Sequence, residues 1–231
     1  MRVEFHILGP IEVAGDSGAI RLGGPRQRAV LAILLLHPNQ VVPVERIVDD
    51  LYGDAGPATA LAQVRDHVSQ LRKLLGEGAG GGSGETVIET HPPGYLLRVE
   101  PDEVDASRFE ALTERAFGAL DRKDADAAAR LLRDGLALWR GPPLADFLNE
   151  SFAQPAIARL EALRLRALER RIEADLLLGQ DGKLVGELEE LVREHPLREQ
   201  LRAHLMLALY RSGRQAEALS VYHETRALLG E

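Results

Sequence analysis

The chain has 231 residues and no cysteine, is 45% hydrophobic and 28% charged, and carries a formal net charge of −8. This composition suits folded domains with substantial cores and excludes disulfide bonds and thiolate metal sites. No apolar run reaches the length of a membrane span and the N-terminus lacks a signal-peptide pattern, so we expect a cytoplasmic protein. Net acidity argues weakly against nucleic-acid binding, but phosphate contacts are local, and the placement of the cations decides.

The first half of the chain begins with strand and helix patterns. Residues 3–22 alternate apolar and polar positions between Gly, Pro, Asp and Ser turns, which predicts a small antiparallel sheet. Pro25 suits the first turn of a helix, and strong helix formers follow it as far as His37. A second helix is expected after Pro43, ending at Gly53.

The third predicted helix, TALAQVRDHVSQLRKLLG at residues 59–76, has one apolar and one polar side. The apolar residues recur at intervals of three and four and are expected to face the core: Leu61, Val64, Val68, Leu71 and Leu75. The opposite side carries Ala62, Gln63, Asp66, Ser69, Gln70 and Lys73, with Arg65 and Arg72 on one flank. Such a side is either a plain solvated face or a surface that reads another molecule.

A Gly-rich segment, GEGAGGGSGE, follows this helix. Its Gly76, Gly78 and Gly81 have G-x-G-x-x-G spacing, but the segment follows a helix, precedes a strand and lacks Gly-Lys-Ser/Thr. We therefore interpret it as a flexible loop rather than a phosphate-binding loop. Beyond it, TVIET and YLLRV on either side of His-Pro-Pro-Gly predict a β-hairpin.

Three helices followed by a hairpin are typical of a winged helix-turn-helix, in which the third helix enters the major groove and the wing touches the backbone or minor groove. Arg26 and Arg28 lie where the first helix begins, and there the helix dipole, free N–H groups and guanidinium groups can converge on a phosphate. His91 at the hairpin tip, with Tyr95 and Arg98 on its return strand, are further candidate phosphate contacts. The alternative is that these three are surface residues without a role.

From Pro101 onward the sequence predicts successive amphipathic helices. GKLVGELEELVREH from Gly182 and GRQAEALSVYHETR from Gly213 start 31 residues apart, a pattern similar to tetratricopeptide helix pairs but shorter than their 34-residue period. Such arrays bind polypeptides or couple domains. Trp139, the sole tryptophan, is expected to be a core residue that closes a helix, with a partner-docking anchor as the alternative.

No catalytic or metal-binding motif occurs in the sequence. H-E-x-x-H, G-x-S-x-G and P-loop patterns are absent, and the seven histidines are scattered. His195 and His204 could approach each other, but surface or capping roles are favoured over ligation. We therefore expect no enzyme activity, no metal site and no cofactor.

Several stretches together resemble the Streptomyces antibiotic regulatory protein family over nearly the whole chain. They are LGPIEV, LGGPRQRAVLAILLLHPNQVVPVERIVDDLYG, VSQLRKLLG, ETHPPGYLLRV, LALWRGPPLADF, and RIEADLLLG through HPLREQLRAHLMLALYRSGRQAEALSVY. The resemblance implies an α+β, OmpR-type winged helix-turn-helix domain at residues 1–98. It implies an all-α, tetratricopeptide-like bacterial transcriptional activator domain at residues 99–231. Family members typically continue beyond this length, so both a small regulator and a part of a larger one fit.

The resemblance also implies a function and a site. It places the recognition helix on residues 59–75 and the wing on residues 86–98, and it places base and phosphate contacts on Arg65, Ser69, Gln70, Arg72 and Lys73. Asp66 departs from this pattern, because an acid repels phosphate, although it can accept a hydrogen bond from a cytosine amine.

The expected protein is an activator of a secondary-metabolite gene cluster, not an enzyme. Its expected partners are direct repeats in double-stranded promoter DNA, a second protomer side by side on that DNA, and RNA polymerase holoenzyme including its sigma factor. It would lie in the cytoplasm, with the nucleoid, and not at a membrane. The rival hypothesis is a pure interaction scaffold, whose helical array binds a protein and whose winged domain serves packing. The scaffold predicts no salt-dependent binding to duplex DNA.

Overall fold

The structure, a computed structural model, divides the chain into two compact units. It describes residues 3–16, 18–53, 56–78 and 87–230. The first unit comprises residues 1–110 and 137–162, and the second comprises residues 111–136 and 163–231.

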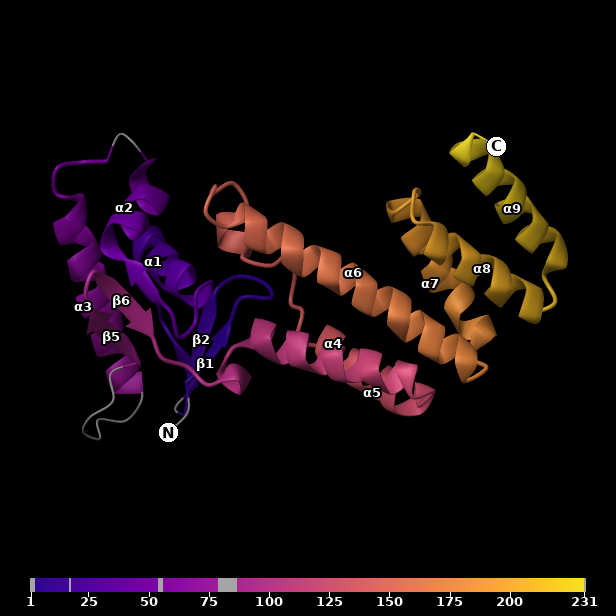
Figure 1. Cartoon of the computed structure of the whole chain (residues 1–231), viewed down its shortest axis with the longest axis horizontal. Coiled ribbons are helices and arrows are strands. Elements are labelled where there is room, and N and C mark those ends of the chain that lie inside the picture. The colour runs from indigo at the N-terminus through magenta and orange to yellow at the C-terminus, as the bar shows by residue number, and fades with distance from the viewer. Residues whose placement is uncertain (1–2, 17, 54–55, 79–86, 231) are drawn as a thin grey trace. The chain divides into compact units, whose positions relative to one another are not determined.

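The first unit opens with the expected sheet (Figure 1). Its strands are β1 (Glu4–His6), β2 (Glu12–Gly15) and β3 (Gly18–Ile20), which pair antiparallel in the order β1-β2-β3. Phe5 pairs with Val13 across the first two strands, and only 1% of each residue is exposed. The alternation in the sequence therefore places one side of this sheet in the core.

The winged helix-turn-helix follows, as the sequence predicts. Its helices are α1 (Pro25–Leu35), α2 (Val44–Tyr52) and α3 (Ala60–Gly78), and its wing strands are β5 (Ile88–His91) and β6 (Gly94–Leu97). A further strand that we did not predict, β4 (Val41–Pro43), pairs with β6, so the sheet order is β4-β6-β5. Three residues are too few for an alternating pattern to be recognised. Residues 79–85 of the Gly-rich segment, expected to be a flexible loop, lie outside the described residues, as does Thr86.

Helix α3 packs its apolar stripe against the rest of the first unit. At most 1% of Val64, Val68, Leu71 and Leu75 is exposed. The prediction for Leu61 is wrong, because 43% of this residue is exposed. The stripe begins instead at Ala60, the first residue of the helix, which is 4% exposed, and Leu61 lies at the stripe's edge.

The segment around residues 137–147 belongs to the first unit and lies against the turn between β1 and β2. The backbone N–H groups of Arg140 and Leu144 donate hydrogen bonds to the carbonyl oxygens of Leu8 and Ile7, each at 2.8 Å. Asp105, the first residue of α4 (Asp105–Asp121), accepts hydrogen bonds from the backbone N–H groups of Ile7 at 2.8 Å and Leu8 at 3.0 Å. The stretches LGPIEV and LALWRGPPLADF are thus joined by backbone hydrogen bonds.

Trp139 is half-buried in this segment, where it makes an edge contact with Phe109 at 5.3 Å between ring centroids. It does not close a helix as expected, because α5 (Ala125–Leu136) has ended three residues earlier. Packing by the ring, rather than helix continuation, holds it in place.

The second unit consists of helices, which confirms the predicted array. They are the C-terminal part of α4, then α5, most of α6 (Gln154–Leu177), α7 (Asp181–Glu194), α8 (Glu199–Arg211) and α9 (Gln215–Leu229). Buried leucines of α6, α7 and α8 form the main core, with Ala218 and Val221 of α9 packed against it. Gly179 and Gly213, both at positive φ, make the turns that follow α6 and α8.

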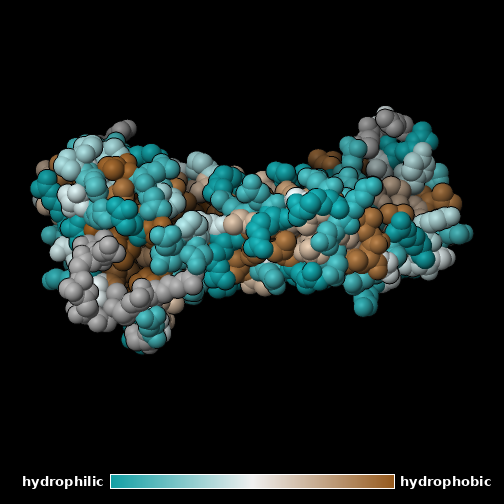
Figure 2. Space-filling model, turned by 60° about the horizontal axis from the view of Figure 1, so that its bottom comes forward, coloured by the Kyte–Doolittle hydropathy of each residue, from teal (hydrophilic) through white to brown (hydrophobic). Residues whose placement is uncertain are grey.

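The face drawn in Figure 2 is mostly hydrophilic, with hydrophobic residues gathered in separate patches. Among the described residues, no helix is both long enough and apolar enough to cross a membrane.

Candidate nucleic-acid interface

The outward side of α3 presents a row of polar side chains to solvent. Five of the residues named from the sequence are exposed on it: Arg65, Asp66, Ser69, Gln70 and Lys73. Within the described part of the chain, neither Arg65 nor Lys73 forms an ion pair. Two cations with uncommitted donors therefore flank a hydroxyl and an amide on one helix, the residue types that bind phosphates and base edges.

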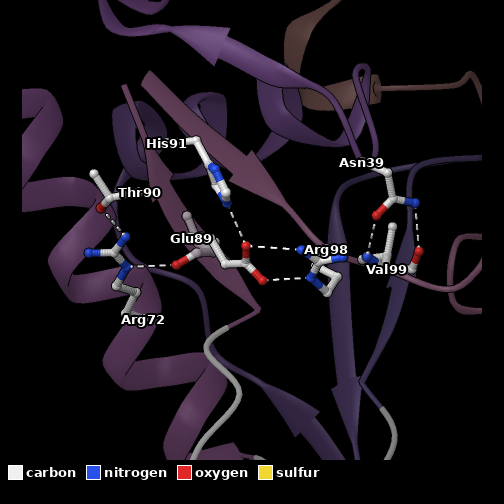
Figure 3. A network of polar contacts seen from close by, with 8 residues as sticks. Asn39, Arg72, Glu89, Thr90, His91, Arg98 and Val99 are labelled. Carbon is white, nitrogen blue, oxygen red and sulfur yellow. Dashed lines mark hydrogen bonds and ion pairs between the residues drawn. The ribbon is translucent and has the colours of Figure 1, made fainter. Parts of the chain in front are cut away.

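Arg72, which is predicted to contact DNA, connects α3 to the wing (Figure 3). Its Nε donates a hydrogen bond to the carbonyl oxygen of Ile88 at 2.8 Å, and its Nη2 donates to Oγ1 of Thr90 at 2.7 Å. Its guanidinium carbon also lies 5.8 Å from the centre of the Tyr95 ring. These contacts orient the guanidinium along the wing, and they could not be predicted from local patterns because Thr90 lies 18 residues away.

Glu89 accepts hydrogen bonds from two of the predicted phosphate contacts of the wing (Figure 3). Its Oε1 accepts a hydrogen bond from Nε of Arg98 at 2.5 Å, and its Oε2 accepts from Nη2 of Arg98 at 3.0 Å and from Nε2 of His91 at 2.7 Å. The hydrogen bonds from Arg98 and then from His91 lower the pKa of Glu89 to about 2. The carboxylate is therefore ionised throughout the physiological pH range.

Tyr95 is mostly withdrawn from the surface, since only 8% of it is exposed. It lies on β6, opposite Thr90 of β5 and Val42 of β4. Its ring packs in the wing sheet near Arg72, which leaves little of it to meet DNA.

The start of α1 brings Arg26 toward α3. The guanidinium of Arg26 stacks over the Tyr52 ring at 4.5 Å and donates from Nη1 to Oε1 of Gln63 at 3.5 Å. This helix begins at Gly24 and Pro25 without a side-chain cap and without an acid in its first turn. Free N–H groups and a nearby cation favour an anion at this end.

Arg28 pairs with an acidic side chain of the first unit, Asp146. Its Nη1 donates to Oδ1 of Asp146 at 2.8 Å, and Oδ2 of Asp146 accepts the backbone N–H of Ile11 at 2.7 Å. The prediction that Arg28 contacts phosphate is untested, but its charge is already paired within the first unit.

Two residues that the sequence analysis did not single out line the hollow between α1 and α3. Gln27, 3% exposed, donates from Nε2 to Oε1 of Gln70 at 3.4 Å. His67 lies half-buried beside Arg26, and burial, followed by the charge of Arg26, lowers its pKa. The position of Gln27 between two predicted phosphate contacts was the only signal for it.

The described residues contain no group of three or more His, Cys, Asp or Glu side chains arranged to hold a metal ion. The polar groups gathered on α3, on the wing and at the start of α1 are mostly cations, amides and hydroxyls, together with the carboxylates of Asp66 and Glu89. This arrangement suits binding to an anionic polymer.

Two family models together match most of the chain. Residues 19–97 match the family model described as transcriptional regulatory protein, C terminal, and residues 104–231 match the model described as bacterial transcriptional activator domain. The regulatory protein AfsR of Streptomyces coelicolor is 41% identical over 230 residues, which cover 99% of this chain and 22% of AfsR. The regulatory protein DnrI of Streptomyces peucetius is 35% identical, over 98% of this chain and 85% of DnrI.

A solved structure is also similar. It is that of Mycobacterium tuberculosis EmbR in complex with a low affinity phosphopeptide, with a TM-score of 0.93 and 35% sequence identity. The similarity covers 99% of this chain and 60% of the EmbR chain. The present chain thus spans most of DnrI, but less than two thirds of AfsR and EmbR.

Proposed function

Because the chain belongs to the Streptomyces antibiotic regulatory protein family of transcriptional regulators, we propose that it activates transcription by binding specific duplex DNA through α3 and the wing. In this proposal residues 1–98 are the DNA-binding domain and residues 99–231 the transcriptional activator domain. The target in this proposal is the promoter of a secondary-metabolite gene cluster, in keeping with membership of an antibiotic regulatory protein family.

The observation that carries the proposal is the exposed polar side of α3. Arg65 and Lys73 have no ion-pair partner among the described residues, and Ser69 and Gln70 are exposed on the same helix. The cations supply sequence-independent affinity by displacing counterions from phosphates. The amide of Gln70 suits an adenine edge, and each well-formed bidentate contact discriminates bases by about 1–3 kcal/mol. Asp66, exposed on the same side of α3, can select a cytosine by accepting a hydrogen bond from its amine.

Arg72 has a positioning role in this proposal. Its hydrogen bonds to Ile88 and Thr90 set the wing against the recognition helix. The wing then presents His91 and Arg98 beside the groove that α3 enters, and Tyr95 supports them from within the sheet. Arg26, exposed at the start of α1, adds a phosphate contact, and Arg28 joins it only if the contact with Asp146 opens.

We further propose that two protomers bind side by side on direct repeats and that the helical unit contacts RNA polymerase holoenzyme, including its sigma factor. Exposed Tyr210, Leu219 and Tyr222 on α8 and α9 support a protein-binding role for this unit, because contiguous apolar surface marks interaction sites. The place of action is the nucleoid in the cytoplasm.

The proposal is tested by fluorescence anisotropy with labelled promoter duplexes, chosen by genome-wide selection of bound DNA, over a range of salt concentrations. We expect tight binding to selected duplexes, weaker binding to scrambled ones, and affinity that falls steeply with salt. The absence of binding at every salt concentration would reject the proposal and favour the interaction scaffold.

A further inference from the structure

The wing carries its own anion at the place where a DNA-binding wing meets phosphates. Glu89 lies in the middle of β5, and its carboxylate is bound by Arg98 on one side and His91 on the other (Figure 3). About 29% of the Glu89 side chain is exposed, against 58% for Arg98 and 46% for His91. The three charged or polar groups therefore form an accessible cluster, in which the negative charge offsets a positive one.

We propose that Glu89 acts as an internal counter-ion that limits the sequence-independent affinity of the wing for DNA, by holding Arg98 and His91 in competition with phosphate. This inference rests on the proposed DNA-binding function and adds a residue to it. A phosphate oxygen must displace the Glu89 carboxylate or share the Arg98 guanidinium with it. Either way, the wing gains less from each phosphate contact than an unpaired cation would.

The hairpin does not depend on this carboxylate for its register. The backbone of Glu89 pairs with Leu96, and the neighbouring pairs Ile88–Leu97 and Thr90–Tyr95 continue the ladder. Arg72 ties the same strand to α3 through Ile88 and Thr90, the residues on either side. Because backbone pairing and Arg72 hold the strand, the charge of Glu89 is free to serve another role.

The hydrogen bonds from Arg98 and His91 also favour the ionised form of Glu89. With a pKa of about 2, the carboxylate stays ionised across the physiological pH range. The counter-ion is therefore constant and does not respond to pH. What it changes is the balance between intramolecular pairing and phosphate binding.

The contrast with α3 supports this role. Arg65 and Lys73, on the helix that would read base edges, have no carboxylate partner in the described part of the chain, whereas Arg98 and His91 of the wing share one. Contacts from the wing to phosphates add affinity for every sequence equally. Pairing of the wing groups with Glu89, while the α3 cations stay unpaired, therefore keeps the affinity for random DNA low.

The test compares the wild-type chain with Glu89→Gln on a random-sequence duplex, by anisotropy titrations at several salt concentrations. Glu89→Gln keeps the size of the side chain but removes the charge. One additional neutralised phosphate should steepen the slope of log affinity against log salt by about 0.9 and raise affinity about 5- to 10-fold at 0.1 M salt. The matched control, Glu190→Gln, removes an exposed charge from α7 and should leave both quantities unchanged.

Two further variants separate the counter-ion role from a structural one. Glu89→Thr, with a side chain that suits a strand, should give the same steeper slope as Glu89→Gln if charge is what matters. In an Arg98→Gln background, Glu89→Gln should lose most of its effect, because the released cation is gone. Far-UV circular dichroism and thermal midpoints establish that each variant is folded.

The outcomes distinguish the inference from the function on which it rests. If the wild-type chain binds DNA and Glu89→Gln and Glu89→Thr bind with the same slope and affinity, the counter-ion role is overturned and the proposed function stands. If no variant binds DNA at any salt concentration, both are overturned. A steeper slope in both Glu89 variants, lost in the Arg98→Gln background, supports the inference.

Discussion

The side chain of Arg72 donates a hydrogen bond to the carbonyl oxygen of Ile88 at 2.8 Å and thereby joins the third helix to the first strand of the wing. A second bond, to Thr90, makes use of the forked geometry of the guanidinium. Arg72 is therefore a connection within the fold as well as a charge near the interface.

Replacing Arg72 by Ala should reduce both stability and DNA affinity. Loss of a charged donor to a backbone carbonyl costs about 1–3 kcal/mol, which a thermal or urea unfolding curve detects. Arg72→Lys should recover part of the DNA affinity, by its charge, but little of the stability, because an ammonium cannot donate in the same two directions. An unchanged unfolding midpoint in Arg72→Ala would contradict the role of this residue as a connection.

Replacing Lys73 by Ala should weaken DNA binding without changing stability. The residue is exposed and forms no ion pair with the described residues, so the unfolding midpoint should not move. Loss of one phosphate contact should make the salt slope of DNA binding shallower by about 0.9. The control is Lys183→Ala, which replaces another exposed lysine, on α7, and should bind DNA as the wild type does. Equal salt slopes for the wild type, Lys73→Ala and Lys183→Ala would show that Lys73 does not contact phosphate.

Gly94 should not tolerate a side chain. A Cβ atom there would lie 1.8 Å from the carbonyl oxygen of Val42, so β4 and β6 would have to separate. We expect Gly94→Ala to lower the free energy of unfolding by about 1–3 kcal/mol or more. Gly186→Ala, inside α7 where a Cβ meets no atom within 4 Å, should instead raise it by about 0.5–1 kcal/mol. Chemical denaturation of the two variants would show whether the opposite signs hold.

Stability should fall as the pH drops below the usual pKa of histidine. Burial lowers the pKa of His204 from 6.5, while Glu173 raises it and Arg170 lowers it. Below pH 6.5 the unfolded chain binds a proton here that the folded chain does not, so the free energy of unfolding decreases until the folded-state pKa is reached.

His37 and His67 have lowered pKa values as well and act in the same direction. His204→Gln should therefore show a shallower, not an absent, loss of thermal stability between about pH 7.5 and 5.5. A wild-type thermal midpoint that rises as the pH is lowered from about 7.5 to about 5.5 would refute the prediction that these histidines destabilise the folded state in acid.

Patterns within short stretches predicted most of the fold. The intervals between Val64, Val68, Leu71 and Leu75 placed α3 and its buried stripe correctly, and the turn residues between apolar runs placed the hairpin. The strand β4 was missed, because three residues become a strand only by pairing with β6. Leu61 was misplaced, because its position at the edge of the stripe depends on which neighbours cover the first turn.

Local sequence also determined which residue types stand on the outward side of α3 and in the wing, since helix and strand periodicities are set by the backbone. Whether a cation on these elements is available was decided only by the tertiary structure. Arg28 meets Asp146 across 118 residues, Arg72 meets Thr90 across 18, and Glu89 meets Arg98 across the hairpin. A charge pairs with whatever the folded chain brings within a few ångströms, and that proximity has no signature in the order of the residues themselves.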